Sequence, residues 1–354
     1  MTTDHLQVQK GRHVYTESML DPEVRAAIEN TDPSVLLASM VPESGDIAAW
    51  AARQRESRAA LLAARPRVPN DNVSITERRI PGEAGAPDIP VRIYTHVQRT
   101  ALSPALLWLY GGAFMFGSLD EFHDQYVQLA DQLRAVVVGV DYRKAPDHPF
   151  PAGVNDCYAA LLWTASHASD LGIDPERLIV GGVSAGATFT AALTQMARDR
   201  NGPPIAFQLP LFAALDDRLV THSSRAIDYP YIVNATQYER VWRRYLGPNP
   251  PSETSPYCAP NRAADLTGLP PAYMAVGELD PMRDENIQYA MRLMAAGVSV
   301  ELHVYPGAPH GIGGPNPESN LGRRFRAEMQ DSLQRALTER RSTSRAADGV
   351  PVST

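Results

Sequence analysis

The sequence predicts an α/β protein with a mainly parallel, eight-stranded sheet, helices on both faces of the sheet, and a helical cap. From residue 105 onward, short apolar segments typical of buried strands alternate with longer segments typical of helices, which is the pattern of a parallel sheet with crossover helices. A Gly-x-Ser-x-Gly pattern at 182–186 lies between one such strand and one such helix. The 354 residues are 44% hydrophobic and 21% charged, so the chain can bury a large core.

The N-terminal part of the chain carries no strand pattern, and we expect residues 1–67 to form one part of the cap. Asp21-Pro22 is a typical helix start, and the Ala- and Leu-rich segment 46–64 predicts a longer helix. The segments 73–80 and 91–95 have the composition of strands and are separated by a turn with Pro and Gly. They predict a hairpin at one edge of the sheet.

The other predicted elements alternate along the chain. The predicted strands are 105–109, 135–140, 178–182, 205–211, 272–276 and 298–304. The predicted helices are 120–134, 155–166, 187–193, 284–296 and 321–339. A segment rich in Tyr and Pro interrupts the alternation, and we expect it to lie over the strand ends with the N-terminal helices. The predicted organisation is a core at 68–215 and 261–340, a cap insertion at 216–260 and a disordered tail at 341–354.

Charge and cysteine content exclude several classes of protein. The net charge of -7 gives no indication of a basic surface for nucleic acid or acidic lipid. Cys157 and Cys258 provide neither a disulfide framework nor a metal-ligand cluster. The N-terminus lacks an apolar signal segment, and no apolar run is long enough to span a bilayer. We therefore expect a soluble, cytoplasmic protein without stable membrane insertion.

The segment around Ser184 carries the strongest catalytic signal. An apolar run, 178–182, ends in two glycines, and a helix rich in small residues is predicted from residue 187. Strand, tight turn and helix are the context of a nucleophile elbow, in which the serine is held in a strained position at the end of the sheet. Ser184 is the predicted nucleophile.

A serine hydroxyl needs a base within hydrogen-bond reach and a group that orients the base. His310 lies in a Gly/Pro loop directly after a predicted strand, and Asp280 follows the preceding predicted strand. Loops at the carboxyl ends of parallel strands meet at the same edge of a sheet, so we predict His310 as base and Asp280 as orienting acid. Asp284 is the alternative acid, but it lies where a helix cap is expected. His303 lies inside a strand, and we expect it to be structural.

Ester or amide chemistry also requires N–H donors for the oxyanion that forms in the transition state. Gly111, Gly112 and Ala113 follow the strand 105–109, and glycines allow backbone N–H groups to approach a ligand closely. We predict donors at Gly112 and Ala113, with the N–H of Ala185, which follows the nucleophile, as the third. Apolar and aromatic residues near this loop and in the insertion predict the substrate pocket: Phe114, Met115, Phe116, Tyr229, Tyr231 and Trp242.

These residues resemble the hormone-sensitive-lipase-like branch of the α/β-hydrolases, also called bacterial family IV esterases. The resemblance spans roughly residues 91–311. It is carried by Tyr110-Gly-Gly-Ala113, Asp141-Tyr-Arg-Lys-Ala-Pro-Asp-His-Pro-Phe-Pro-Ala152, Gly182-Val-Ser-Ala-Gly-Ala187, Asp280-Pro-Met-Arg-Asp-Glu285 and His310-Gly-Ile312. The order Ser, Asp, His along the chain is that of α/β-hydrolases.

The resemblance implies an α/β-hydrolase fold whose cap is built from the N-terminus and an insertion after the sixth strand. It implies the nucleophile, acid and base roles given above, and it assigns Arg143 and His148 to a structural motif. It is also compatible with a homodimer through the last strand and helix.

The sequence departs from the family pattern at four positions. Tyr110 replaces a histidine and Ala113 a glycine of the oxyanion loop, while Val183 replaces an aspartate and Ala187 a glycine beside the nucleophile. Ala113 can present its N–H if its dihedral angles are not those that only glycine tolerates. We expect these changes to affect rate and substrate preference more than mechanism.

The predicted function is a serine carboxylic ester hydrolase that acts on short-to-medium acyl or aryl esters through an acyl-enzyme. Its expected partner is a small-molecule ester, with no metal, other cofactor or nucleic acid. An amidase or lactonase with the same triad is an alternative. A ligand-binding receptor on a hydrolase scaffold, as in the plant gibberellin receptors, is another, although those lack the catalytic histidine. The histidines show no metal-ligand spacing such as His-x-x-x-His.

Overall fold

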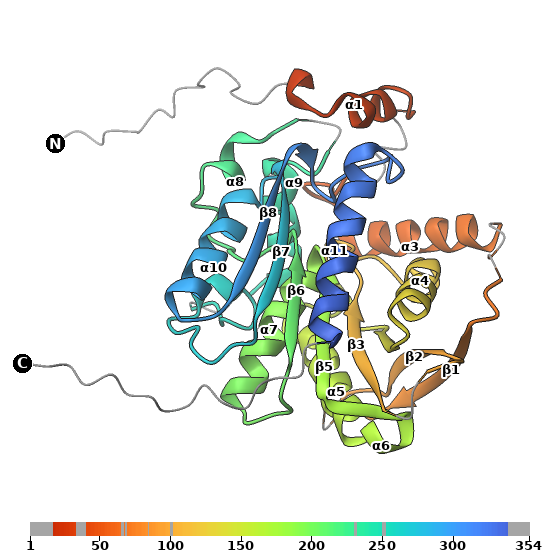
Figure 1. The fold of residues 1–354 in the computed structure, drawn as a ribbon. Helices are drawn as coiled ribbons and strands as arrows, with labels where there is room; N and C mark the ends of the chain where they lie inside the picture. The colour runs from red at the N-terminus through yellow and green to blue at the C-terminus, as the bar shows by residue number, and fades with distance from the viewer. Residues whose placement is uncertain are drawn as a thin grey trace, which may run out of the picture.

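The computed structural model describes residues 17–32, 40–64, 67, 69–83, 85–99, 102–229, 232–249 and 253–338. Its centre is one eight-stranded sheet with the order β1-β2-β4-β3-β5-β6-β7-β8 (Figure 1). The strands are β1 (Val73–Ile80), β2 (Ile89–His96), β3 (Ser103–Leu109), β4 (Val136–Val140), β5 (Ile173–Val183), β6 (Phe207–Leu211), β7 (Ala272–Leu279) and β8 (Val300–Pro309).

The sheet is mainly parallel, as predicted. Strand β1 pairs antiparallel with β2, and β2 pairs antiparallel with β4, which places the predicted hairpin at one edge. The pairs from β4 and β3 through to β8 are all parallel. The predicted fold class is therefore confirmed.

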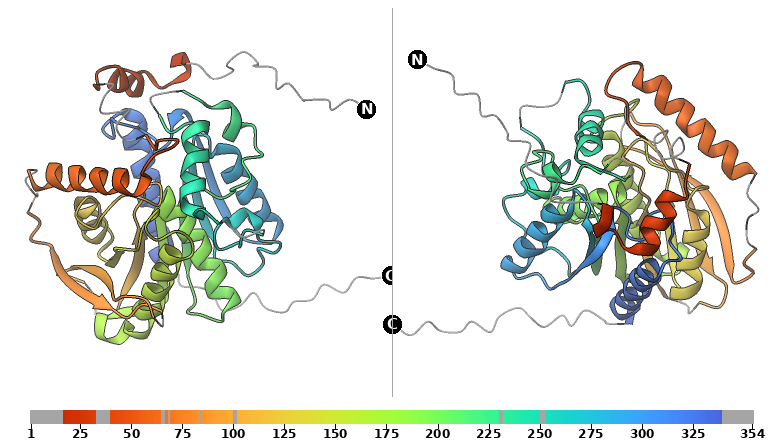
Figure 2. Two further views of the ribbon diagram at one scale, coloured as in Figure 1. Left: turned by 180° about the vertical axis from the view of Figure 1, so that it is seen from behind. Right: turned by 90° about the horizontal axis from the view of Figure 1, so that it is seen from above.

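Helices cover both faces of the sheet. The described helices are η1 (Glu17–Met19), α1 (Pro22–Glu29), α3 (Ile47–Ala63), α4 (His123–Leu133), α5 (Ala152–Ser166), α6 (Ala168–Leu171), α7 (Ala185–Asp199), α8 (Ser223–Ala226), α9 (Ala235–Leu246), η2 (Pro260–Arg262), α10 (Arg283–Ala295) and α11 (Asn320–Thr338). Helices α4 and α11 lie on one face, and α5 and α7 lie on the other (Figures 1 and 2). Helix α10 lies on the same face as α7 and contacts it, since Gln195 Nε2 of α7 donates to Tyr289 Oη of α10 at 3.1 Å.

Burial explains why the central strands read as continuous apolar runs. All residues of β3 and β4 are buried, as parallel strands with helices on both faces require. The edge strand β1 is mostly exposed, and only its first and last residues, Val73 and Ile80, are buried.

Several elements differ from the sequence-based expectation at their ends. Strand β8 continues to Pro309, through residues that the Gly/Pro composition assigned to a loop, because β7 pairs with it as far as Leu279 opposite Pro309. Strand β6 begins at Phe207 rather than at Ile205. The short helices α6 and α8 have no helical periodicity in the sequence, since each spans only four residues.

The N-terminal segment and the 216–260 insertion contact each other above the sheet. Helix α9, whose first turn is capped by Asn234, lies beside residues 40–46. The N–H of Val41 donates to Gln237 Oε1 at 2.7 Å, and Arg240 Nη1 donates to the carbonyl of Val41 at 3.0 Å. Arg244 Nη2 donates to the carbonyl of Glu43 at 2.7 Å. These contacts tie together two segments that are about 200 residues apart in the chain.

Among the described residues, no helix is both long and apolar enough to cross a lipid bilayer.

Candidate active site

Ser184 lies at the sharp turn between β5 and α7. Its backbone has φ 54° and ψ -120°, a conformation that is strained for a residue with a side chain. The turn is held by the N–H of Ser184, which donates to the carbonyl of Leu211 at 3.0 Å. A glycine is required at position 186, two residues after Ser184, because a Cβ there would lie 2.1 Å from the carbonyl oxygen of Leu109. This close packing of strand and helix leaves the Ser184 side chain at the end of the sheet.

His310 and Asp280 complete a continuous hydrogen-bonded chain with Ser184. His310 Nε2 lies 2.9 Å from Ser184 Oγ, and His310 Nδ1 lies 2.7 Å from Asp280 Oδ2. Asp280 is fully buried, and its other oxygen, Oδ1, accepts the N–H of Met282 at 2.9 Å. The structure thus brings together three side chains from loops that are distant in the sequence.

The alternative acid, Asp284, has a different environment. It accepts the N–H of Ser223 at 2.8 Å and the Nε of Arg283 at 2.8 Å, so it ties α8 to the start of α10. Burial opposes ionisation of this carboxyl, but these bonds lower its pKa overall. His303 lies on the edge strand β8, where its Nε2 is 2.8 Å from Glu301 Oε1. Neither residue is bonded to Ser184.

The predicted oxyanion loop lies against the nucleophile. A Cβ on Gly111 would be 3.1 Å from the Cβ of Ser184, and 3.0 Å from the carbonyl oxygen of Val183. Gly112 and Ala113 both have positive φ, 138° and 52°. Ala113 therefore adopts the left-handed region, which an alanine tolerates at a cost of about 1–2 kcal/mol. The departure from glycine at this position is compatible with the loop.

Tyr110, the second departure in this loop, is a buried anchor. Its hydroxyl donates to Asp141 Oδ1 at 2.8 Å, and its ring stacks on Tyr142 with centroids 4.6 Å apart. The hydroxyl of Tyr142 donates back to the carbonyl of Tyr110 at 2.9 Å. Burial raises the pKa of Tyr110, so it stays a neutral donor. Asp141 and Tyr142 thereby fix the start of the predicted oxyanion loop.

Arg143 lies next to this anchor and pairs with a buried carboxylate. Its Nη2 lies 2.7 Å from Asp156 Oδ1, and its N–H donates to Asp156 Oδ2 at 2.8 Å. Only 2% of the Asp156 side chain is exposed. His148 is exposed to solvent. Neither Arg143 nor His148 lines the cavity that contains Ser184.

Ser184 and His310 open into a cavity of about 440 Å³. Most of its wall is apolar, and the wall combines core loops with the N-terminal segment and α9. The predicted site residues that line the cavity are Gly111, Gly112, Ala113, Phe114, Phe116, Ser184, Ala185 and His310.

The other predicted pocket residues are placed elsewhere. Met115 is fully buried, and its N–H donates to the carbonyl of Gly112 at 2.9 Å. Tyr229 is half-buried and does not line the cavity. Tyr231 lies outside the described residues. Trp242 packs in an aromatic cluster, 6.0 Å from Phe114 and 6.2 Å from Tyr238 between ring centroids.

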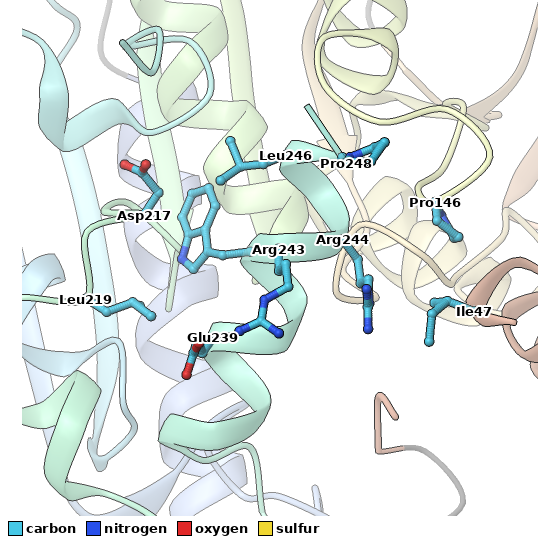
Figure 3. Close-up of a pocket in the computed structure, with 11 residues that line it drawn as sticks. Ile47, Pro146, Asp217, Leu219, Glu239, Arg243, Arg244, Leu246 and Pro248 are labelled. Atoms are coloured by element: carbon cyan, nitrogen blue, oxygen red, sulfur yellow. Dashed lines mark hydrogen bonds and ion pairs between the residues drawn. The ribbon is translucent and has the colours of Figure 1, made fainter. Parts of the chain in front are cut away.

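Trp242 instead lines a separate cavity of about 490 Å³ beside α9 (Figure 3). Three of the charged groups around that cavity are in ion pairs: Arg243 Nη2 lies 2.6 Å from Glu239 Oε1, and Asp217 accepts Arg262 Nε at 2.7 Å. Ser184 does not border this cavity. Trp242 therefore does not line the Ser184 cavity, contrary to the prediction, and it packs in the aromatic cluster instead.

Several residues that line the Ser184 cavity were not predicted as site residues, and Arg58, Phe212 and Tyr238 are the large side chains considered next. Arg58, on α3, has its Nη1 2.8 Å from Glu121 Oε1 and its guanidinium 5.0 Å from the centre of the Phe116 ring. Phe212 follows β6 directly, and Tyr238 lies on α9. The Tyr-rich composition of the insertion was a signal for Tyr238, whereas nothing in the sequence distinguishes Arg58 from other helix-surface arginines.

Tyr238 is bonded to a buried acid of the core. Its hydroxyl donates to Glu285 Oε1 at 2.5 Å, and the N–H of Leu215 donates to the same oxygen at 2.7 Å. Burial raises the pKa of the Glu285 carboxyl well above its usual range, and the nearby Asp216 and Asp280 act in the same direction. Glu285 therefore joins α9, over the cavity, to α10 in the core.

No group of three or more His, Cys, Asp or Glu side chains in the described part of the chain is arranged to hold a metal ion.

Comparisons with known proteins identify the family to which this fold belongs. A family model described as the alpha/beta hydrolase fold matches residues 106–313. Esterase LipI of Mycobacterium tuberculosis is 40% identical over 257 residues, which are 70% of this chain and 78% of the relative. Carboxylesterase NlhH of the same species is 41% identical over 66% of this chain and 74% of the relative.

Among solved structures, a bacterial heroin esterase is 39% identical and superposes with a TM-score of 0.82, covering 92% of this chain and all of the other. The fold and the site together define a serine-hydrolase type of α/β protein. The chain belongs to the α/β-hydrolase family, and its resemblance to the hormone-sensitive-lipase-like branch is confirmed.

Proposed function

We propose that this protein is a carboxylic ester hydrolase in which Ser184 is the nucleophile, His310 the general base and Asp280 the group that orients the base. The observation that carries the proposal is the unbroken hydrogen-bonded chain from Ser184 Oγ through the imidazole to the buried carboxylate, at 2.9 and 2.7 Å. The names of the relatives, which are esterases and carboxylesterases, support the same reaction class.

In the first half-reaction, Ser184 Oγ attacks the ester carbonyl carbon and its proton passes to His310 Nε2. Asp280 accepts the Nδ1–H, which fixes the tautomer with a free Nε2 lone pair and stabilises the imidazolium. The tetrahedral intermediate then collapses, the bond to the alcohol oxygen breaks, and Nε2 returns the proton to that oxygen. The products are a free alcohol and an acyl group on Ser184.

In the second half-reaction, His310 takes a proton from water, and the resulting hydroxide attacks the acyl carbonyl. Collapse of the second intermediate returns the proton to Ser184 Oγ and releases the carboxylic acid. In both steps negative charge develops on the carbonyl oxygen. We assign its stabilisation to the N–H groups of Gly112, Ala113 and Ala185, because the loop 111–113 packs against Ser184 and residue 185 begins α7.

The proposed substrates are short-to-medium acyl or aryl esters. A mostly apolar cavity of about 440 Å³ suits such groups and offers few polar partners to a charged substrate. The division of the chain into a core and a cap formed by residues 1–67 and 216–260 is part of this proposal. It is supported by the residues of the N-terminal segment and of α9 that line the same cavity. A homodimer and a cytoplasmic location stay predictions from the sequence.

Two measurements test the proposal. Ser184→Ala should abolish turnover of ethyl acetate while the far-ultraviolet circular dichroism and the melting temperature stay those of the wild type. Cleavage by this variant at the wild-type rate contradicts the assignment. Comparison of an aryl ester with its matched anilide then separates an esterase from an amidase, since the same triad serves both and only the leaving group differs.

A further inference from the structure

A second cavity adjoins the one that contains Ser184. It has a volume of about 220 Å³ and lies between α4 and α11. Three residues line both cavities: Val183, Phe212 and Gly311. Val183 precedes the nucleophile and Gly311 follows the base, so the shared wall stands directly beside the reacting groups.

The second cavity is apolar inside and polar at the surface. Besides Phe212, its buried lining side chains are Leu129, Ile312, Phe325 and Met329. At the outer end, Gln128 and Gln132 on α4 are exposed. Gln330 on α11 donates to Gln132, which links the two helices across the outer end. A cavity of about 150 Å³ with apolar walls is known to hold a benzene ring, so this one has room for several carbon atoms.

Phe212 is the large side chain of the shared wall. Its ring lies 5.2 Å from the His310 imidazole, at 83°, and 6.1 Å from the ring of Phe325, which lines the second cavity. The backbone of Phe212 has φ 42°, which costs a residue with a Cβ about 1–2 kcal/mol. The conformation is held by the N–H of Phe212, which donates to the carbonyl of Ala275 at 2.7 Å. The chain thus keeps a phenyl ring between the two cavities in a strained conformation.

We propose that Phe212 is a specificity-determining residue that limits the length of the ester's alcohol group, and that the cavity between α4 and α11 is a latent subsite for a longer alkyl chain on that alcohol. This proposal rests on the proposed esterase function. His310 Nε2 must return the proton to the leaving alcohol oxygen, so the alcohol lies beside the imidazole, and Phe212 packs on that same imidazole. The acyl chain has no such requirement to approach Phe212.

Two isomeric esters test the assignment of the alcohol side. Hexyl acetate and ethyl hexanoate contain the same atoms, but the long chain is on the alcohol in one and on the acyl group in the other. Phe212→Ala should raise the ratio of kcat/KM for hexyl acetate to that for ethyl hexanoate at least about tenfold, since one methylene in an apolar pocket is worth about 10-fold or more. An unchanged ratio, or a gain for ethyl hexanoate, overturns the proposal.

A second substitution tests the cavity itself. In the Phe212→Ala background, Met329→Trp fills the space between α4 and α11 and should return the ratio to the wild-type value. Met291→Trp is the matched control, because Met291 is 59% exposed on α10, on the opposite face of the sheet, and should leave the raised ratio in place. A ratio that stays high with Met329→Trp, or falls equally with Met291→Trp, contradicts a subsite at this place.

Phe212→Gly guards against failure of the alanine variant, because glycine adopts φ 42° without strain. If both Phe212 variants are inactive because His310 has lost its packing partner, Val183→Ala tests the shared wall with the same two esters. Turnover of ethyl acetate by any of these variants shows that the esterase function stands even if the ratio does not change. The proposed esterase function is tested separately, by the Ser184→Ala experiment.

Discussion

Gly112 offers a sharp test of the oxyanion loop. Its φ is 138°, and a Cβ added there would lie 2.5 Å from the carbonyl oxygen and 2.6 Å from the carbonyl carbon of Phe116. These are backbone atoms, so no side-chain rotation relieves the contact. The turn is closed by the N–H groups of Met115 and Phe116, which donate to the carbonyl of Gly112 at 2.9 and 2.8 Å. Gly112→Ala must therefore move the loop that carries the N–H groups of residues 112 and 113.

The expected cost follows from the loss of at least one oxyanion donor. Such a loss reduces kcat about 10²–10³-fold, or about 2.7–4 kcal/mol of transition-state stabilisation. Because the donors act mainly on charge that develops after binding, we expect KM to change much less than kcat. Steady-state kinetics with a soluble aryl acetate, together with a melting curve, separate this effect from a loss of folded protein.

Gly297→Ala is the matched control for backbone strain. Gly297 also has positive φ, 79°, but its added Cβ would meet nothing within 4 Å. This variant should lose about 1–2 kcal/mol of stability and keep its kcat. A Gly112→Ala enzyme with wild-type kcat, or an equal fall in kcat for both variants, refutes the role given to the loop.

Three further predictions concern the acids around the site. Asp280→Asn should lower kcat about 10⁴-fold without unfolding the protein, because an amide favours the wrong imidazole tautomer; a small effect in steady-state kinetics contradicts an orienting role. Glu285 has a raised pKa in the folded state, so its neutral form stabilises the fold at low pH, and this contribution is lost as pH rises from about 4.3 through the folded pKa. As pH rises, the unfolding free energy of the wild type should therefore fall relative to that of Glu285→Gln, by at most about 1.4 kcal/mol per pH unit. Urea unfolding of both proteins at several pH values measures this difference. Parallel curves of unfolding free energy against pH would contradict the prediction. Arg143→Ala leaves the buried carboxylate of Asp156 without its partner and should cost about 3–5 kcal/mol of stability, with kcat per folded molecule preserved.

The three side chains proposed to be catalytic could be selected from the sequence because local chemistry marks each of them. Ser184 stands between glycines at a strand-to-helix turn, and His310 and Asp280 each follow a strand. The carboxyl ends of parallel strands share one edge of the sheet, so sequence order alone predicts that these residues meet. The hydrogen-bond distances between them required the structure.

The pocket was harder to predict, because lining a cavity depends on the direction of a side chain. Phe114 and Phe116 line the Ser184 cavity, while Met115 between them is fully buried and does not line it. On α9, Tyr238 reaches the cavity whereas Trp242, one turn later, is taken up by aromatic packing. Neither choice is encoded in composition or periodicity.

Phe212 is a residue of the site that the sequence did not indicate. It is an ordinary apolar residue at the end of a strand in the sequence. Its position between two cavities depends on a positive φ and on the placement of α11, about 110 residues further along the chain. Long-range packing of this kind becomes visible only in three dimensions.

Covalent labelling of the folded protein with a fluorophosphonate tests the central claim most directly. The account predicts a single stoichiometric adduct, located on Ser184 by peptide mass spectrometry, and no adduct in Ser184→Ala. Absence of labelling in the folded wild type, or a label on a different serine, would contradict an activated nucleophile at this position.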